Sequence, residues 1–346
     1  MGLRDQIRHG MSRGVRDTFA VIGERLHAGT PHAAAPTVAR TLAATEPSNP
    51  TASRCAMELI VADGPAGRGR LAAIINPRLL DARGNPFGLF GFFECDENPD
   101  TARWLFDLGM NFLAREGCSV VRGPIDFSTW HDYRFVTEQR APEWIPGEPH
   151  HPPHYIDRFA EAAFTPVATY ATNWLPESPT ELAERFGAKA QACRDLGYTV
   201  RPIEPRDLPA LHAVSSAAFA TAFMYSPIEL DEFLALYSPE RATQAAGSTC
   251  IALSPDGEPV GLHYAFEMAL DGRPRVSVCK TVAVTPAHQD KRVYQLLMSN
   301  WGANAARAGA THLVGALMHA DGSPALMGWI SPDTMIKEYQ LYERSL

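Results

Sequence analysis

Two ionisable side chains stand inside an apolar run where acid–base chemistry can occur. Glu267 and His263 belong to residues 260–270, which are predicted to form a strand. A carboxylate in such a segment is a candidate to take a proton from an amine, directly or through water, and His263 is a weaker alternative. Strand alternation puts both on the face opposite to Tyr264 and Phe266. The same pattern fits a strand whose Glu267 faces solvent, so both interpretations stay open.

A histidine and an aspartate follow the last predicted strand before the C-terminal segment. His319 and Asp321 come just after residues 311–317, at the carboxyl end of a strand, where open α/β sheets commonly place their ligands. His319 is therefore a candidate catalytic group, and Asp321 is a candidate acceptor-binding group. A solvated turn is the other interpretation of a histidine close to an aspartate.

One connection, residues 123–155, is unusually long and rich in Pro, His, Trp and acidic side chains. Connections of this length commonly carry function. Trp130 and Tyr133 can stack on a planar ligand or simply anchor the loop to the core, and His131 stands between them. The sequence predicts that Trp130, His131 and Tyr133 bind an acceptor molecule.

The same connection contains three closely spaced histidines, His150, His151 and His154. The prolines among them prevent a regular helix from setting two of these side chains on one face. Their spacing matches no zinc motif. We therefore expect no bound metal and assign this segment to acceptor binding.

Composition and missing motifs exclude several classes of protein. The chain has no GxSxG elbow of a hydrolase and no GxGxxG or GxxxxGK nucleotide loop. Its six cysteines form no CxxC pair, which indicates reduced thiols in a cytoplasm. The formal net charge of −8 argues against a chain wholly devoted to coating nucleic acid, although it does not exclude a local basic face. No apolar run is long enough to span a bilayer, and the N-terminus lacks a secretory signal.

The chain is expected to begin with a basic helical arm followed by a linker. Residues 27–53 are dominated by Ala, Thr, Pro and Ser and predict a flexible linker. The arm is either an amphipathic helix that contacts phosphate or a partner, or a frayed terminal helix. Its weak apolar pattern is surrounded by Arg4, Arg8, Arg13 and Arg16.

Strands and helices alternate along the rest of the chain, which predicts an α/β protein. Periodicity, caps and turn residues predict strands at 54–62, 69–75, 87–95, 118–121, 165–175, 198–203, 249–254, 260–270, 275–284 and 311–317. They predict helices near 100–116, 157–163, 180–196, 207–222, 227–237 and 289–308. Thr180 is the expected N-cap of the helix that joins the two halves.

The segments CKTVAVTPAHQ at 279–289 and KEYQLYERSL at 337–346 carry a resemblance to a known family. With them, residues 198–346 resemble a domain of the GNAT acyltransferase superfamily. In that family the first segment is a strand that splays from its neighbour, and backbone N–H groups of the following turn hold the pyrophosphate of acetyl coenzyme A. The resemblance implies that Val282, Val284 and Gln289 contact the acyl donor.

The turn after this strand departs from the family pattern. The family has Gln or Arg, two residues, Gly, any residue, then Gly or Ala, whereas this chain reads QDKRVY at 289–294. Arg292 and Tyr294 replace the two small residues, and we expect their side chains to crowd the approach of a phosphate. Lys291 and Arg292 are expected either to bind donor phosphate through side-chain charge or to form an ordinary solvated helix start.

The resemblance also implies a general acid near the C-terminus, where the family commonly uses a tyrosine. Tyr342 is the first candidate and Tyr339 the second. The alternative is a core tyrosine whose hydroxyl is satisfied by a local partner.

The first half resembles the GNAT-like sequences that occur in tandem with a second such domain, through NPRLLDARGNPFGLFGFFECDENPD and VVRGPIDFS. Its equivalent turn, residues 96–100, is acidic and would repel phosphate, so this half is expected to be structural or to build the acceptor pocket. The predicted organisation is an arm and linker at 1–53, then GNAT-like domains at 54–176 and 177–346. Each domain is expected to hold a mixed, mostly antiparallel sheet flanked by helices.

The predicted function is transfer of an acyl or aminoacyl group to a small-molecule amine in the cytoplasm, with the donor as a co-substrate and no bound cofactor. Aminoacyl-tRNA is the favoured donor, because it would use the basic arm together with Lys291 and Arg292. Acetyl coenzyme A is the alternative donor. A catalytically silent GNAT-like binding module is a third hypothesis.

Overall fold

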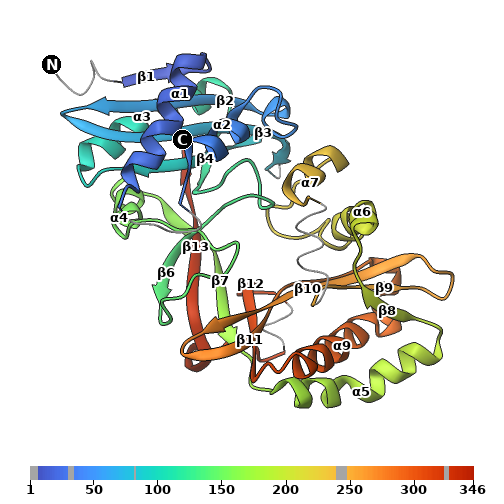
Figure 1. The fold of residues 1–346 in the computed structure, drawn as a ribbon. Coiled ribbons are helices and arrows are strands. Elements are labelled where there is room, and N and C mark those ends of the chain that lie inside the picture. Colours follow the sequence, from blue (N-terminus) through green and yellow to red (C-terminus); the bar gives the residue numbers. More distant parts are fainter. Residues whose placement is uncertain (1–6, 30–34, 82, 239–247, 323–326) are drawn as a thin grey trace.

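The computed structural model describes residues 7–29, 35–81, 83–238, 248–322 and 327–346. Figure 1 shows two layered halves joined by long strands. The strands of the first half are β1 (Ile7–Gly10), β2 (Ala56–Gly64), β3 (Gly67–Leu80), β4 (Pro86–Cys95), β5 (Val120–Gly123), β6 (Phe135–Gln139) and β7 (Thr165–Trp174). Its helices are α1 (Arg13–Leu26), α2 (Val38–Thr45), α3 (Pro99–Arg115) and α4 (His154–Glu161), with a 3-10 turn η2 (Ala52–Arg54).

The second half contributes the remaining elements. Its strands are β8 (Thr199–Pro202), β9 (Cys250–Leu253), β10 (Pro259–Leu270), β11 (Arg273–Val284), β12 (His312–His319) and β13 (Met335–Ser345). Its helices are α5 (Pro179–Asp195), α6 (Leu208–Ala218), α7 (Leu230–Leu236) and α9 (Val293–Arg307), with 3-10 turns η3 (Pro205–Asp207), η4 (Pro286–Lys291) and η5 (Pro332–Thr334). Ser178, not Thr180, caps α5, because its side chain and that of Glu181 form a reciprocal capping box.

The segment predicted as a linker contains an ordered helix. α2 covers Val38–Thr45 and buries Thr41 and Thr45, although the segment has few large apolar residues. Arg16 of α1 forms an ion pair of 2.5 Å with Glu46, just after α2. Charge and small-residue packing thus hold the segment against the first half, a tertiary effect that local composition does not reveal. Arg4 and residues 30–34 lie outside the described residues.

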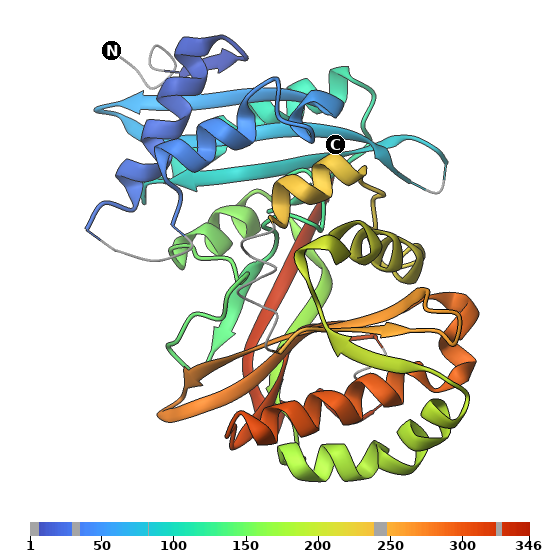
Figure 2. The same cartoon turned by 45° about the vertical axis from the view of Figure 1, so that its right-hand side comes forward.

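The strands of both halves belong to one continuous sheet. Its order is β1-β2-β3-β4-β5-β13-β7-β12-β11-β10-β9-β8, and β6 also pairs with β13. The C-terminal strand β13 therefore lies against β5, with Tyr342 opposite Gly123. β7 of the first half pairs with β12 of the second half. Each half is therefore joined to the other through paired strands. Figures 1 and 2 both show β13, in red, running between the two halves.

Two parallel strand pairs separate part of the way along their length. β11 and β12 pair from Val276 opposite His312 to Cys279 opposite Gly315, and no pairing between them follows although both strands continue. Lys280 is skipped in the register between β10 and β11, which makes it the extra residue of a β-bulge. β4 and β5 pair over only Gly88 and Leu89 of β4. Each half therefore contains a V-shaped opening between parallel strands.

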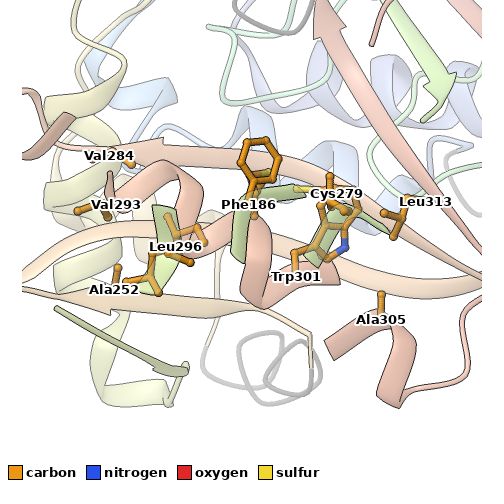
Figure 3. Packing of buried hydrophobic residues seen from close by; sticks show 14 of the residues in the cluster. Phe186, Ala252, Cys279, Val284, Val293, Leu296, Trp301, Ala305 and Leu313 are labelled. Atoms are coloured by element: carbon orange, nitrogen blue, oxygen red, sulfur yellow. The ribbon is translucent and has the colours of Figure 1, made fainter. Parts of the chain in front are cut away.

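The core of the second half lies between its sheet and helices α5 and α9. Trp301 of α9 is 1% exposed, and its indole Nε1 donates to Ser277 Oγ at 2.9 Å. Figure 3 shows Trp301, Leu296 and Val293 of α9 packed with Cys279 and other buried side chains. The opposite face of the sheet carries α6 and α7, whose apolar residues pack on Ile251, Leu262 and Ala283. Helices therefore cover part of both faces of this sheet.

Candidate functional site

A cavity of about 2200 Å³ lies between the two halves. Its lining includes residues of β4, of the connection after β5, of β7 and of β10 to β12. Helix α7 closes one side, because the Arg78 guanidinium of β3 donates two hydrogen bonds to Glu232, at 2.7 and 2.9 Å. A second cavity, of about 710 Å³, lies over α3 and the C-terminal end and contains none of the predicted site residues.

The large cavity passes through the sheet at the opening between β11 and β12. Its lining includes Tyr264 and Phe266, which share the face of β10 on the side of the first half. It also includes Met298 and Trp301 of α9, the helix that covers the other face. Gly315, the last residue of β12 that pairs with β11, also lines the cavity. One continuous space therefore connects the cleft between the halves with the groove beside α5 and α9.

The predicted donor-binding residues divide into two groups. Val282, Val284 and Gln289 line the cavity, at the part of β11 that has separated from β12 and just after it. Lys291 and Arg292 do not line it in the part of the chain that the structure describes. Lys291 is instead paired with Asp290 at 2.8 Å on the surface.

The turn keeps the backbone shape that glycine would favour, although the glycine is absent. Arg292 has φ of +65°, the left-handed conformation, at the position directly before α9. Tyr294, where the family has its second small residue, lines the cavity, and its ring lies 6.2 Å from that of Phe186 on α5. Its hydroxyl donates to Met327 Sδ at 3.3 Å. The tyrosine thus narrows the groove between α5 and α9, as the sequence indicated.

All the predicted acceptor-binding residues line the cavity. The Trp130 indole Nε1 donates to the Ser226 carbonyl at 2.9 Å, which fixes the ring beside Phe233 of α7. His131 bonds Ser128 Oγ through Nδ1 at 3.1 Å, and burial lowers the pKa of its ring to about 4, so it is neutral at physiological pH. Tyr133 and Asp321 also line the cavity, and acceptor binding stays a prediction for these residues.

His319 lies in the same cavity with one ring nitrogen available. Its Nδ1 accepts a hydrogen bond from the Asp321 backbone N–H at 3.2 Å, so the neutral ring carries its proton on Nε2. Nε2 is buried and has no partner among the described residues. The ring packs edge-on against Tyr170 at 5.0 Å. The geometry therefore offers a hydrogen-bond donor inside the cavity.

Tyr342 is not placed to act as the predicted general acid. It is 5% exposed, belongs to the core of the first half beside Phe135 and Phe159, and is absent from the cavity lining. Its hydroxyl donates to Gln340 Oε1 at 3.0 Å. The correction follows from the sheet order, because β13 carries this residue to β5 instead of keeping it beside β11.

Tyr339 is fully buried, belongs to a network of hydrogen-bonded polar side chains and does not line the cavity. Its hydroxyl donates to Glu148 Oε1 and lies 3.0 Å from Thr172 Oγ1. Lys337 Nζ donates to Glu148 Oε2 at 2.7 Å. Burial, with the Glu148 charge beside it, holds the pKa of Tyr339 well above its usual range. This network ties the connection that contains Gly147 to β13, so Tyr339 positions the cavity wall and does not reach a substrate.

Glu267 does not line the cavity. Ser277 Oγ donates to it at 3.4 Å, and Ser277 is also the partner of the Trp301 indole on the α9 side of the sheet. Strand alternation, correctly predicted, groups Glu267 with His263, but the covered side of the sheet takes that group. Neither is part of the cavity lining, so the structure corrects the prediction that Glu267 is a base for the acceptor amine.

Two of the three histidines of the long connection, His151 and His154, bond to the backbone. His151 Nε2 accepts from the Val136 N–H at 2.8 Å, and His154 Nε2 lies 3.1 Å from the Cys95 carbonyl. His150 packs beside His27, with ring centroids 5.6 Å apart. Within the described ranges, no group of three or more His, Cys, Asp or Glu side chains is arranged to hold a metal ion.

The corresponding opening in the first half is filled by the chain itself. The Ile125 N–H donates to the Phe90 carbonyl at 2.8 Å, and the Phe92 N–H donates to Asp126 Oδ1 at 2.7 Å. These bonds occupy the backbone groups of β4 where it has left β5. Asp126 also lines the large cavity, and burial raises the pKa of its carboxyl to about 7. The first half therefore supplies a wall of the cleft and has no second channel of this kind in the part of the chain that the structure describes.

Arg134, Tyr170 and Lys280 also line the cavity, and the sequence analysis did not single them out. Arg134 is 5% exposed, and its guanidinium lies 4.0 Å from the Tyr133 ring centroid and 4.4 Å from that of Tyr170. Burial, with Arg134 as its strongest charged neighbour, lowers the pKa of Lys280 to about 8. A lysine within the apolar strand segment CKTVAV was the one signal for this group in the sequence.

No helix among the described residues is long and apolar enough to cross a membrane. The basic residues of the arm and of the α9 turn do not form one surface, because Figures 1 and 2 place α1 and α9 at opposite ends of the molecule. Arg16 is moreover paired with Glu46. A nucleic acid that contacted both would have to span the molecule.

Comparison with known proteins identifies the fold. No family model matches the sequence, and neither does any curated protein. Among solved structures, a tandem GNAT protein from the clavulanic acid biosynthesis pathway is 12% identical, with 98% of both chains covered and a TM-score of 0.51. A GCN5-related N-acetyltransferase from Anabaena variabilis is 9% identical, covering 98% of this chain and 72% of its own, with a TM-score of 0.59. A probable N-acyltransferase from Enterococcus faecalis is 9% identical, covering 98% of this chain and 72% of its own, with a TM-score of 0.55. The chain therefore has the tandem GNAT fold.

Proposed function

We propose that this protein is an amide-forming acyltransferase whose donor and acceptor approach from opposite faces of one sheet. The observation that carries the proposal is the opening between β11 and β12, through which the cavity passes. A donor with a narrow acyl-bearing arm enters along α5 and α9, and an amine binds in the cleft between the halves. The similar structures described as N-acetyltransferases support this chemistry.

The residues around the opening provide the elements of acyl transfer. An acyl carbonyl that emerges between the strands meets the edge of β12, where His319 Nε2–H has no acceptor among the described residues. That group can donate a hydrogen bond to the developing oxyanion, and the departing thiolate or alkoxide takes its proton from water in the cleft. The amine loses its proton to water in the cleft or to the carboxylate of Asp321, which lines the cavity.

Two basic side chains lie at the mouth of the donor side. Arg185 and Lys189 of α5 are exposed and line the cavity beside the first turn of α9, and Arg185 is paired with Glu177. A phosphate-bearing carrier fits this charge. Both acyl coenzyme A and aminoacyl-tRNA carry phosphates, so the donor class is decided by experiment.

The first experiment is calorimetric titration with acetyl coenzyme A and, separately, with charged tRNA at several salt concentrations. Micromolar binding of coenzyme A alone would identify an acyl coenzyme A-dependent enzyme. Binding of charged tRNA that weakens steeply with salt would identify an aminoacyl donor. Mass spectrometry of amine mixtures incubated with each donor then detects the amide product. Neither donor binding nor product would overturn the proposal and leave a silent binding module.

A matched pair of variants tests the opening itself. Val282→Phe places a ring on the part of β11 that has separated from β12, and we expect it to abolish donor binding. Val120→Phe, at a half-buried position on β5 outside the cavity lining, controls for the added bulk. Equal donor binding by the two variants would show that the donor does not use the opening.

A further inference from the structure

Arg134 is a buried cation that has no ion pair with any other residue that the structure describes. It has φ of +69°, an uncommon conformation for a non-glycine residue, and it turns its side chain into the tyrosine-lined part of the cavity. The rings of Tyr133, Tyr170 and Tyr339 surround the guanidinium, at 4.0, 4.4 and 5.5 Å from their centroids. Its Nε and Nη1 are buried without an acceptor, and the described residues offer it no ion pair.

Lys280 reaches the same region from the other half. The β-bulge in β11 turns it out of the regular alternation, and its Nζ lies against Gly147, where any side chain would collide with it. Glu148, the residue after Gly147, accepts from the Tyr339 hydroxyl, and the Arg134 guanidinium lies over the Tyr339 ring, so the two cations lie in one region of the cavity. No ion pair or hydrogen bond of the Lys280 amine is present among the described residues.

The nearest carboxylates have other partners. Asp132 is paired with Arg40 at 3.0 Å. Glu148 accepts from Lys337 at 2.7 Å and from the Tyr339 hydroxyl. Two cations with unmet donors that lie close together in one cavity are costly unless an anion joins them.

We propose that Arg134 and Lys280 form a carboxylate-binding subsite, so that the acceptor is an amino acid or a related amine that carries a carboxylate. The guanidinium is held on its faces by tyrosines, which leaves its edge to meet a planar carboxylate, and Lys280 adds a point charge. Tyr170 links the subsite to the reaction centre, since its ring contacts both Arg134 and His319. A carboxylate held at Arg134 therefore places the rest of the acceptor toward His319 and the strand opening.

The carboxylate-binding subsite rests on the proposed function only because its ligand is called the acceptor of the acyl group. Binding to the subsite is measured without an acyl donor. Calorimetry measures binding of the proteinogenic L-amino acids and, for each that binds, of the corresponding carboxamide. Wild-type protein is expected to bind at least one amino acid and to bind its amide roughly tenfold more weakly or worse, because the amide lacks the charge. No binding of any amino acid, or equal binding of acid and amide, would overturn the subsite.

Variants separate the subsite from general damage. Lys280→Met should weaken carboxylate binding roughly tenfold or more while leaving amide binding unchanged, and Arg134→Gln should act in the same direction. Arg103→Gln, on exposed helix α3 outside the cavity, removes one positive charge as a control and should change neither. Equal weakening of acid and amide by Lys280→Met would mean a structural role and refute the subsite. Inorganic phosphate that competes with the amino acid and binds more tightly would assign the cations to a phosphate instead.

Discussion

The clearest consequence of the structure for stability is that Lys280→Met makes the protein more stable at neutral pH. The pKa of Lys280 falls from 10.5 to about 8 on folding, because burial and Arg134 disfavour the charged amine. At about 1.4 kcal/mol for each pKa unit, this difference corresponds to about 3 kcal/mol. The side chain is only half-buried, so screening by cleft water reduces the expected gain to about 1–2 kcal/mol. Methionine keeps the length of the side chain and removes the charge.

The pH dependence gives this prediction its sign. Between about pH 8 and pH 10.5 the unfolded chain binds the Lys280 proton and the folded protein does not, so wild-type stability gains from this group as the pH rises. The advantage of Lys280→Met is therefore largest below pH 8 and disappears toward pH 10.5. Taking the difference between the two proteins cancels the other groups that titrate there.

The assay is urea unfolding of both proteins at intervals from pH 7 to pH 10, followed by tryptophan fluorescence. The free energy of unfolding comes from linear extrapolation, and equal slopes would show that both proteins expose the same surface. A variant that is less stable than wild type at pH 7, or a difference that does not change with pH, would refute the claim that Lys280 is an uncompensated cation.

Three further predictions concern other positions. Asp126→Asn should stabilise the protein at pH 8 by up to about 4 kcal/mol and lose this advantage below about pH 4, because the raised pKa of Asp126 makes wild type lose stability as the pH rises through about 4 to 7. Thermal unfolding of both proteins across this pH range measures the difference, and a difference that does not change with pH would contradict the prediction. Arg292→Gly should raise the melting temperature slightly, since it relieves a left-handed conformation that costs about 1–2 kcal/mol, and should tighten coenzyme A binding in calorimetry if side-chain crowding is the obstacle. Tyr342→Phe should leave turnover in the transfer assay unchanged, and a large loss would restore Tyr342 as the acid.

Local patterns predicted most of the elements that build the site. The alternation of residues 260–270 correctly grouped Glu267 with His263 opposite Tyr264 and Phe266, because side chains on a strand repeat every second residue. The sequence also showed that the turn before α9 lacks the glycine of the family pattern, and the structure places Arg292, at that position, in the left-handed conformation. The strand alternation and the turn pattern each depend only on residues close together in the chain, and the sequence by itself supplies these.

Tertiary structure decided which of these groups reach the cavity. Tyr342 was misplaced because strand order joins β13 to β5, a pairing between segments far apart in the chain. Alternation could not say which face of β10 is covered by α9, so the sequence left open whether Glu267 reaches a ligand. Arg134 and Lys280 meet only because a loop of one half lies against a bulged strand of the other. The sequence by itself determined the elements and the fold class, through short-range periodicity and turn chemistry, whereas long-range strand pairing decided the site.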